Sequence, residues 1–388
     1  MNTYAPIEMR KFVAPEFLFG AGSMEMIANY VRNLGVRKVM LVTDPGVINA
    51  GWAAHVGTLI EKASVPHIVF SDVSPNPRDT EVMKGAELYE REKCDMIVAV
   101  GGGSPMDCAK GIGIVTINRM HILDFEGVDR IPLPGPPLIC VPTTSGTAAD
   151  ISQFSIILDT RRNVKIAIVS KSIVPDAALI DPVTTTTMSP RLAAETGMDA
   201  LVHAIEAYVS NASSPFTDIN ALRAIRMISE SLPDAVESGC DIRHMDRMML
   251  GSTLAGLAFS NASLGLVHAM AHSLGGSLDL PHGECNALLL EHVVAYNFES
   301  VPSRYGDILG AMGIDPARMS GQAVRDALLG AIHELRVKVG IGHSLSTIGV
   351  TDEAIPALAA TAAADACAVT NPREASVPAI EEIFRHAL

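Results

Sequence analysis

The C-terminal half of the sequence carries a set of side chains whose types and spacing suit a divalent metal ion. Asp199 and His203 lie four residues apart in GMDALVHAIEAYVS, which has helical periodicity, so both side chains leave one helix face. His268 and His272 have the same spacing in LGLVHAMAHSLGG, and His282 follows at a Pro-His-Gly turn. Carboxylate and imidazole groups together are good ligands for such ions. The spacing leaves open which of His268 and His272 binds metal and which faces a substrate.

These residues lie in apolar helical segments, and the cost of burying them there distinguishes a metal centre from an ordinary helical core. A single histidine on an Ala/Leu-rich helix is more often a core residue than a ligand. Burying an aspartate together with several imidazoles is costly without partners, and shared coordination offsets that cost. We therefore predict a metal centre, whose ligand types fit Fe2+, Zn2+ and other first-row ions.

A glycine-rich turn in the N-terminal half is typical of an anion-binding site. The segment VAVGGGSPMDCAKGIG places Gly101, Gly102 and Gly103 between a buried strand and a helix, with Pro105 suited to the first helical turn. Glycines let the backbone approach a pyrophosphate, and a helix N-terminus favours negative charge. A plain strand-to-helix connection would use the same residues, and the spacing departs from the common G-x-G-x-x-G pattern.

Two further polar sites follow predicted strands of the same half. Asp44 ends the run KVMLVTD, where its carboxylate would accept hydrogen bonds from an adenosine ribose and oppose a 2'-phosphate, which favours NAD over NADP. An aspartate there is also a common helix cap. Thr143, Thr144 and Thr147 follow another strand in VPTTSGTAAD, either as a second wall around the cofactor or as an ordinary loop.

The elements that must position these groups change character along the chain. Short β-branched runs alternate with helical patterns in the first half, which predicts a parallel sheet with crossover helices. Two runs flanking the polar segment DTRRN predict an antiparallel hairpin appended to that sheet. The sheet runs are residues 38–44, 67–73, 96–104, 137–144 and 177–181, the hairpin runs are 153–158 and 164–169, and a helix is predicted at 79–93.

Beyond DPVTTTTMSP the sequence is helical throughout, with almost no β-rich run, and the four threonines would form a polar connector. We therefore predict two domains, an α/β dinucleotide-binding domain at 1–188 and an all-helical metal-binding domain at 189–388. A length of 388 residues also favours two domains over one.

Composition restricts the partners and the compartment. The net charge of -14, with no local Lys/Arg run, argues against nucleic acid and membrane partners. The N-terminus lacks the pattern of a signal peptide, so we expect a cytoplasmic protein. The six scattered cysteines indicate reduced, mostly buried thiols, and the 48% hydrophobic content favours a homo-oligomer, a dimer or larger.

Taken together, the segments GGGSPMDCAK, PTTSGTAAD, GMDALVHAIEAYVS and HAMAHSLGG...LPHGECNA resemble the iron-containing, group III alcohol dehydrogenases in order and spacing over essentially the whole chain. The resemblance implies a Rossmann-like N-terminal domain and an all-α C-terminal domain of the dehydroquinate synthase-like fold. NAD and metal would meet in the cleft between them.

The resemblance also assigns roles to individual positions of this sequence. The implied metal ligands are Asp199, His203, His268 and His282, and His272 becomes the catalytic histidine beside the substrate. The implied cofactor contacts are Asp44, Asn76, Gly102, Gly103, Ser104, Asp107, Thr143, Thr144, Thr147 and Lys165.

The implied activity is the reversible oxidation of short primary alcohols or diols to aldehydes, dependent on NAD and Fe2+, with iron chosen through the resemblance alone. The alternatives are a zinc-dependent polyol oxidoreductase similar to glycerol dehydrogenase, and a regulatory protein that binds NAD and metal without useful turnover. Family members often have glycine at Ala148, glutamate at Asp150 and proline at Ser273, so phosphate-loop geometry and substrate preference are the features most open to change.

Overall fold

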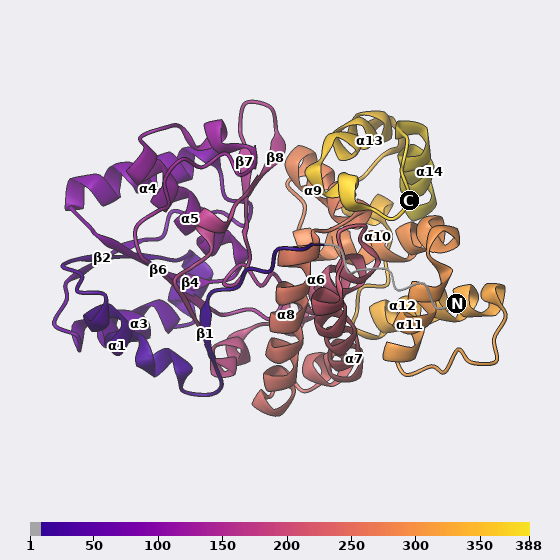
Figure 1. The fold of residues 1–388 in the computed structure, drawn as a ribbon, viewed down its shortest axis with the longest axis horizontal. Helices are drawn as coiled ribbons and strands as arrows, with labels where there is room; N and C mark the ends of the chain where they lie inside the picture. The colour runs from indigo at the N-terminus through magenta and orange to yellow at the C-terminus, as the bar shows by residue number, and fades with distance from the viewer. Residues whose placement is uncertain (1–8) are drawn as a thin grey trace.

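The structure, a computed structural model, describes residues 9–388 of the chain. The described chain forms two parts that lie side by side (Figure 1), an α/β part in indigo to magenta and a helical part in red-brown to yellow. The first eight residues of the predicted N-terminal domain lie outside the described residues.

A six-stranded sheet with the order β1-β9-β6-β4-β2-β3 forms the centre of the α/β part, and all its pairs are parallel. Five of its strands match the predicted runs, whereas the short edge strand β1 follows no pattern that we identified. The strands are β1 (Glu16–Phe19), β2 (Val39–Val42), β3 (His67–Phe70), β4 (Met96–Gly101), β6 (Leu138–Pro142) and β9 (Ala177–Ile180).

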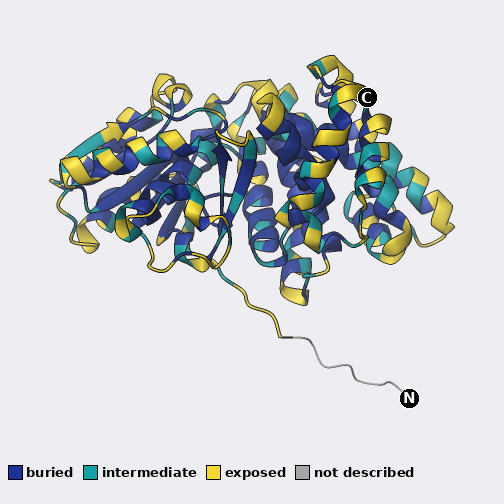
Figure 2. Cartoon of the chain, turned by 90° about the horizontal axis from the view of Figure 1, so that it is seen from above, coloured by how far each residue is buried: buried dark blue, intermediate teal, exposed yellow. Residues whose placement is uncertain are grey.

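Helices cover both faces of this sheet because successive strand residues point to opposite sides. Met40 and Val42 of β2 pack in a core with α4 and α5, whereas Val39 and Leu41 pack in a second core with α1 and α3. Figure 2 shows the buried strands between the more exposed helices. The helices are α1 (Ile27–Asn33), α2 (Pro45–Asn49), α3 (Trp52–Glu61), α4 (Asp79–Glu92) and α5 (Gly103–Asn118).

The predicted hairpin forms, but our expectation that it extends the main sheet is wrong. Its strands β7 (Phe154–Asp159) and β8 (Val164–Val169) pair antiparallel, and β5 (Gly127–Val128) joins β8 in a separate three-stranded sheet. The hairpin is held against α5 instead, because the buried Nζ of Lys110 donates to the carbonyl oxygens of Ser152 and Phe154.

The helical part begins after the four threonines, which belong to a short 3-10 helix, η4 (Pro182–Thr187). Ser189 caps the next helix by accepting a hydrogen bond from the amide of Leu192. The proposed boundary at 188 therefore falls between the last strand and the first long helix. The helices are α6 (Pro190–Val209), α7 (Pro215–Glu237), α8 (Ile242–Ala262), α9 (Leu266–Leu278), α10 (His282–Asn297), α11 (Pro302–Ala311), α12 (Gly321–Lys338), α13 (Ile355–Ala364) and α14 (Val377–Ala387).

Within residues 9–388, no single helix has the length and hydropathy of a membrane span; α8 and α9 reach them only together, as a pair bent by 98°. All six cysteines are buried free thiols.

The two parts meet closely where α9 lies against β8. A side chain at Gly275 would place its Cβ 2.7 Å from Nζ of Lys165, and one at Gly276 would come within 3.0 Å of the Lys165 backbone nitrogen. Nearby, the buried Asn76 amide donates to Asp279 at the end of α9 over 2.6 Å. The absence of side chains at these glycines allows direct contact between helix and strand.

A second close approach of the two parts predicts a strongly destabilising substitution. A Cβ at Gly146 would lie 2.6 Å from Cβ and 2.7 Å from the carbonyl oxygen of Thr196 on α6. We expect Gly146→Ala to lower the stability by about 2 kcal/mol, the cost of overpacking a core. Gly330→Ala is the control, because a Cβ within α12 there meets nothing within 4 Å and alanine favours the helix. Equal thermal midpoints for the two variants would contradict the close approach.

Candidate metal and dinucleotide site

One cavity between the two parts collects most of the predicted site residues. Its walls come from the glycine turn, β7 and β8 on one side and from α6, α9 and α10 on the other. The predicted residues that line it are Asn76, Gly103, Ser104, Asp107, Thr147, Lys165, Asp199, His203, His268, His272 and His282. Asp44, Gly102, Thr143 and Thr144 do not line this cavity.

Three of the four predicted metal ligands converge at its inner end. Oδ1 of Asp199 lies 3.7 Å from Nε2 of both His268 and His282, and one ligand atom from each residue lies within 4.8 Å of the others. These separations suit an ion about 2.1 Å from each atom. His203 lies beside this group, with Nδ1 3.9 Å from Oδ2 of Asp199 and its ring stacked on His268 at a centroid distance of 4.5 Å.

The chemistry of the donors fits a bound cation. Burial lowers the pKa of His203 to about 4 and that of His282 well below its usual value, so both imidazoles keep free lone pairs. Nδ1 of His203, the ring nitrogen nearest Asp199, is buried without a hydrogen-bond partner. Burial opposes ionisation of Asp199, but the surrounding imidazoles outweigh it and hold the pKa of this carboxyl below its usual range. Assigning the four residues to a metal stays a prediction.

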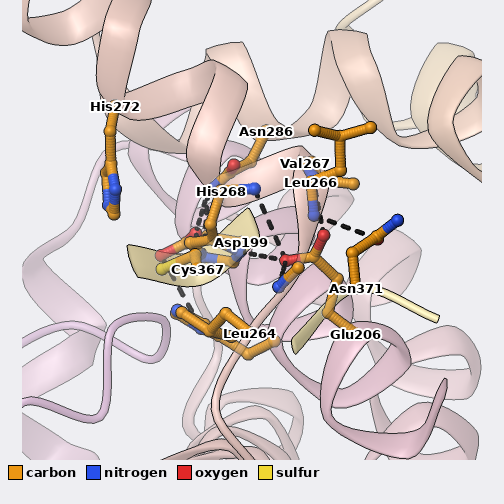
Figure 3. Close-up of polar contacts among 12 residues, drawn as sticks. Asp199, Glu206, Leu264, Leu266, Val267, His268, His272, Asn286, Cys367 and Asn371 are labelled. Atoms are coloured by element: carbon orange, nitrogen blue, oxygen red, sulfur yellow. Dashed lines mark hydrogen bonds and ion pairs between the residues drawn. The ribbon is translucent and has the colours of Figure 1, made fainter. Parts of the chain in front are cut away.

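Glu206, which we did not predict, holds His268 in place. Its carboxylate lies 2.6 Å from Nδ1 of His268 and accepts hydrogen bonds from the amides of Gly265 and Val267 at the start of α9 (Figure 3). Burial lowers the pKa of His268, but the neighbouring carboxylates of Asp199 and Glu206 outweigh it and raise that pKa to about 9. The available signal was spacing, because Glu206 follows Asp199 by seven residues and shares its helix face.

His272 faces the same cavity but has a separate partner. Its Nδ1 lies 2.9 Å from a carboxylate oxygen of Asp365, and its ring stacks on His282 with centroids 5.4 Å apart. Asp365 also accepts a hydrogen bond from the amide of Cys367. If Nδ1 donates to Asp365, the Nε2 lone pair is left free. Asp365 lies far along the chain, and no pattern in the sequence indicated it.

The glycine turn and the threonine segment face each other as expected. A Cβ on Gly102 would lie 3.2 Å from the side chain of Thr144, and one on Gly103 would lie 2.9 Å from Cγ2 of Thr147. The amide of Thr143 donates to the carbonyl of Gly101. The N-terminus of α5 and Thr147 line the cavity together, in an arrangement that suits a phosphate group.

The remaining predicted cofactor residues have mixed surroundings. Oδ1 of Asp44 accepts a hydrogen bond from the amide of Val47, so Asp44 does cap α2. Oγ of Ser104 donates to the carbonyl of Pro75 over 2.5 Å. Ala148 has a φ of 47°, a left-handed conformation that favours glycine. The threonine segment therefore keeps a glycine-like backbone without the glycine.

Comparison with known proteins adds independent information about the whole chain. Residues 14–182 match the sequence model of the family described as iron-containing alcohol dehydrogenase, and residues 193–388 match that of the family's C-terminal domain. The 1,3-propanediol dehydrogenase of Citrobacter freundii is 40% identical over 95% of this chain and 96% of its own length. The NAD-dependent methanol dehydrogenase of Bacillus methanolicus is 35% identical over 97% of this chain and 99% of its own. A crystal structure of 1,3-propanediol oxidoreductase superposes with a TM-score of 0.95 and 38% identity, covering 98% of this chain and all of that one.

Asp107 generates a prediction about pH. Burial outweighs the attraction of Lys110 and raises the pKa of Asp107 to about 7, so folding favours its protonated form. The contribution of the Asp107 carboxyl to the free energy of unfolding is fully present below pH about 4, the pKa of an unfolded aspartate. It is lost as the pH rises through about 7. We expect Asp107→Asn, which stays neutral, to gain stability relative to the wild type at pH 8, with a much smaller gain at pH 4.5.

Thermal midpoints at the two pH values measure this difference. Asp326→Asn is the control, because it removes the same charge from an exposed position on α12. An Asp107→Asn difference that is the same at both pH values would show that the carboxyl is ionised throughout.

Proposed function

Because the chain belongs to the iron-containing alcohol dehydrogenase family, we propose that it reversibly oxidises short primary alcohols or diols to aldehydes and passes the hydride to NAD. The observation that carries the proposal is the shared cavity. The same cavity contains the converging carboxylate and imidazoles and the N-terminus of α5 beside Thr147. A dinucleotide on the helix terminus would therefore bring its reactive ring toward the metal ligands.

The proposed metal ligands are Asp199, His203, His268 and His282, and the proposed ion is Fe2+. The ion would supply Lewis-acid stabilisation of the negative charge that develops on the alcohol oxygen. The protein's contribution is to bury these groups, to keep two imidazoles neutral and to fix His268 through Glu206. The description of the matched family as iron-containing supports iron over zinc.

The proposed cofactor is NAD, consistent with the similarity to the NAD-dependent methanol dehydrogenase of Bacillus methanolicus. The α5 terminus and Thr147 would hold the pyrophosphate, and Asp44 would hold the adenosine ribose while still capping α2. Ser104 belongs to the α5 terminus, whereas Asn76, Asp107 and Lys165 would surround the nicotinamide half, since all three line the cavity.

His272 is the proposed proton relay. Asp365 fixes one ring nitrogen, so the other is free to exchange a proton with the alcohol hydroxyl or with water. We also propose a homo-oligomeric state, which the 48% hydrophobic content favours, and a cytoplasmic location. The family match and the alcohol dehydrogenases among the relatives favour this activity over the zinc-dependent polyol enzyme and over the regulatory protein.

The central test is NADH formation by anaerobically purified protein with NAD and a panel of short alcohols and diols. We expect turnover with at least one of them, loss of turnover after chelation, and best recovery with Fe2+ rather than Zn2+. A protein that binds metal and NAD but converts no alcohol or aldehyde would instead support the regulatory alternative.

A second test concerns His272. We expect His272→Ala to reduce kcat for alcohol oxidation about 100-fold or more, because the proton loses its positioned acceptor. Metal content and NAD affinity should stay close to those of the wild type. His333→Ala is the control, since His333 pairs with Glu291 on the surface. Unchanged turnover of His272→Ala across the pH range would rule out the relay.

A further inference from the structure

A single amide side chain touches the ligand atoms of all three converging residues. Nδ2 of Asn286 lies 2.6 Å from Oδ1 of Asp199 and 3.3 Å from Nε2 of His268 (Figure 3). It also lies 3.1 Å from Nε2 of His282. Asn286 is fully buried and comes one helical turn after His282 on α10. It therefore contacts groups from three helices, α6, α9 and α10.

The strongest of these contacts is the one to the carboxylate. A 2.6 Å hydrogen bond from an amide to an ionised oxygen is short and charge-assisted, whereas the two contacts to imidazole nitrogens are longer. Oδ1 of Asp199 is also the oxygen that lies 3.7 Å from both Nε2 atoms, while Oδ2 turns toward His203. The amide thus holds the carboxylate in the rotation that points Oδ1 at the two imidazoles.

We propose that Asn286 is a positioning residue of the metal centre that raises its metal affinity by orienting Asp199. This inference rests on the metal centre proposed above. A ligating carboxylate keeps lone pairs for a hydrogen bond from a neighbouring group, and such outer contacts commonly change metal affinity about 10- to 100-fold.

The same geometry allows the opposite effect, in which the Asn286 amide weakens metal binding. The direction of the change in metal affinity when the amide is removed distinguishes the two roles. The amide nitrogen lies close to the position that an ion among the three ligand atoms would take. If its main effect were to compete for their lone pairs, removing it would strengthen metal binding. The orienting role predicts weaker binding.

The test compares Asn286→Ala and Asn286→Leu with the wild type. Dissociation constants for Fe2+, under anaerobic conditions, and for Co2+ are measured by competition with a chromophoric chelator. Visible spectra of the Co2+ proteins report ligand geometry independently of activity. We expect affinities about 10- to 100-fold lower in both variants and altered Co2+ absorption bands. Agreement between the small and the large replacement separates loss of the amide from loss of volume.

Asn297→Ala is the matched control. Asn297 is a buried asparagine at the other end of α10, and its amide pairs with Asn371 rather than with the ligands. The Asn297→Ala protein should lose thermal stability but keep the metal affinity and the Co2+ visible spectrum of the wild type. Unchanged or tighter metal binding in both Asn286 variants, with normal binding by the wild type, would overturn the orienting role alone. Absence of metal binding by the wild type would overturn the metal centre and this inference with it.

Discussion

The structure depends on the burial of a carboxylate among imidazoles in the helical core. Asp199 is 2% exposed, and an ionised group at that depth needs compensation from every side. Helices α6, α9 and α10 supply it through His203, His268, His282 and Asn286. The packing of the helical part is thus tied to the chemistry of its centre, because the groups that satisfy the carboxylate also form the walls of the cavity.

The α/β part is under a different constraint, since its backbone amides must lie close to the proposed dinucleotide without intervening side chains. Parallel strands end at one edge of the sheet, so the glycine turn after β4 and the threonine segment after β6 are neighbours. Their contact is so close that Gly103 has no room for a side chain beside Thr147. Two segments that are separate in sequence therefore form one wall of the cavity, together with the start of α5.

The sequence was most informative where a residue pattern follows directly from local geometry. Alternating runs and long helical periodicity predicted five strands of the main sheet and the helical half, and four-residue spacing placed histidines on common helix faces. The separate second sheet escaped prediction because β5 pairs with β8, a strand distant in sequence, and no local pattern indicates that pairing. Glu206 and Asn286 carried a usable spacing signal that we did not exploit. Asp365 carried none, because only the tertiary fold brings it to His272.

The glycine contact between α9 and β8 has a thermodynamic consequence. The helix that carries His268 and His272 packs directly against the strand that carries Lys165. Gly275 and Gly276 place no flexible side chains between them that could absorb a movement of one element relative to the other. A displacement of either element must therefore be transmitted to the other. If a ligand on one side of this contact shifts its element, linkage requires that the two ligands change each other's binding constants by the same factor.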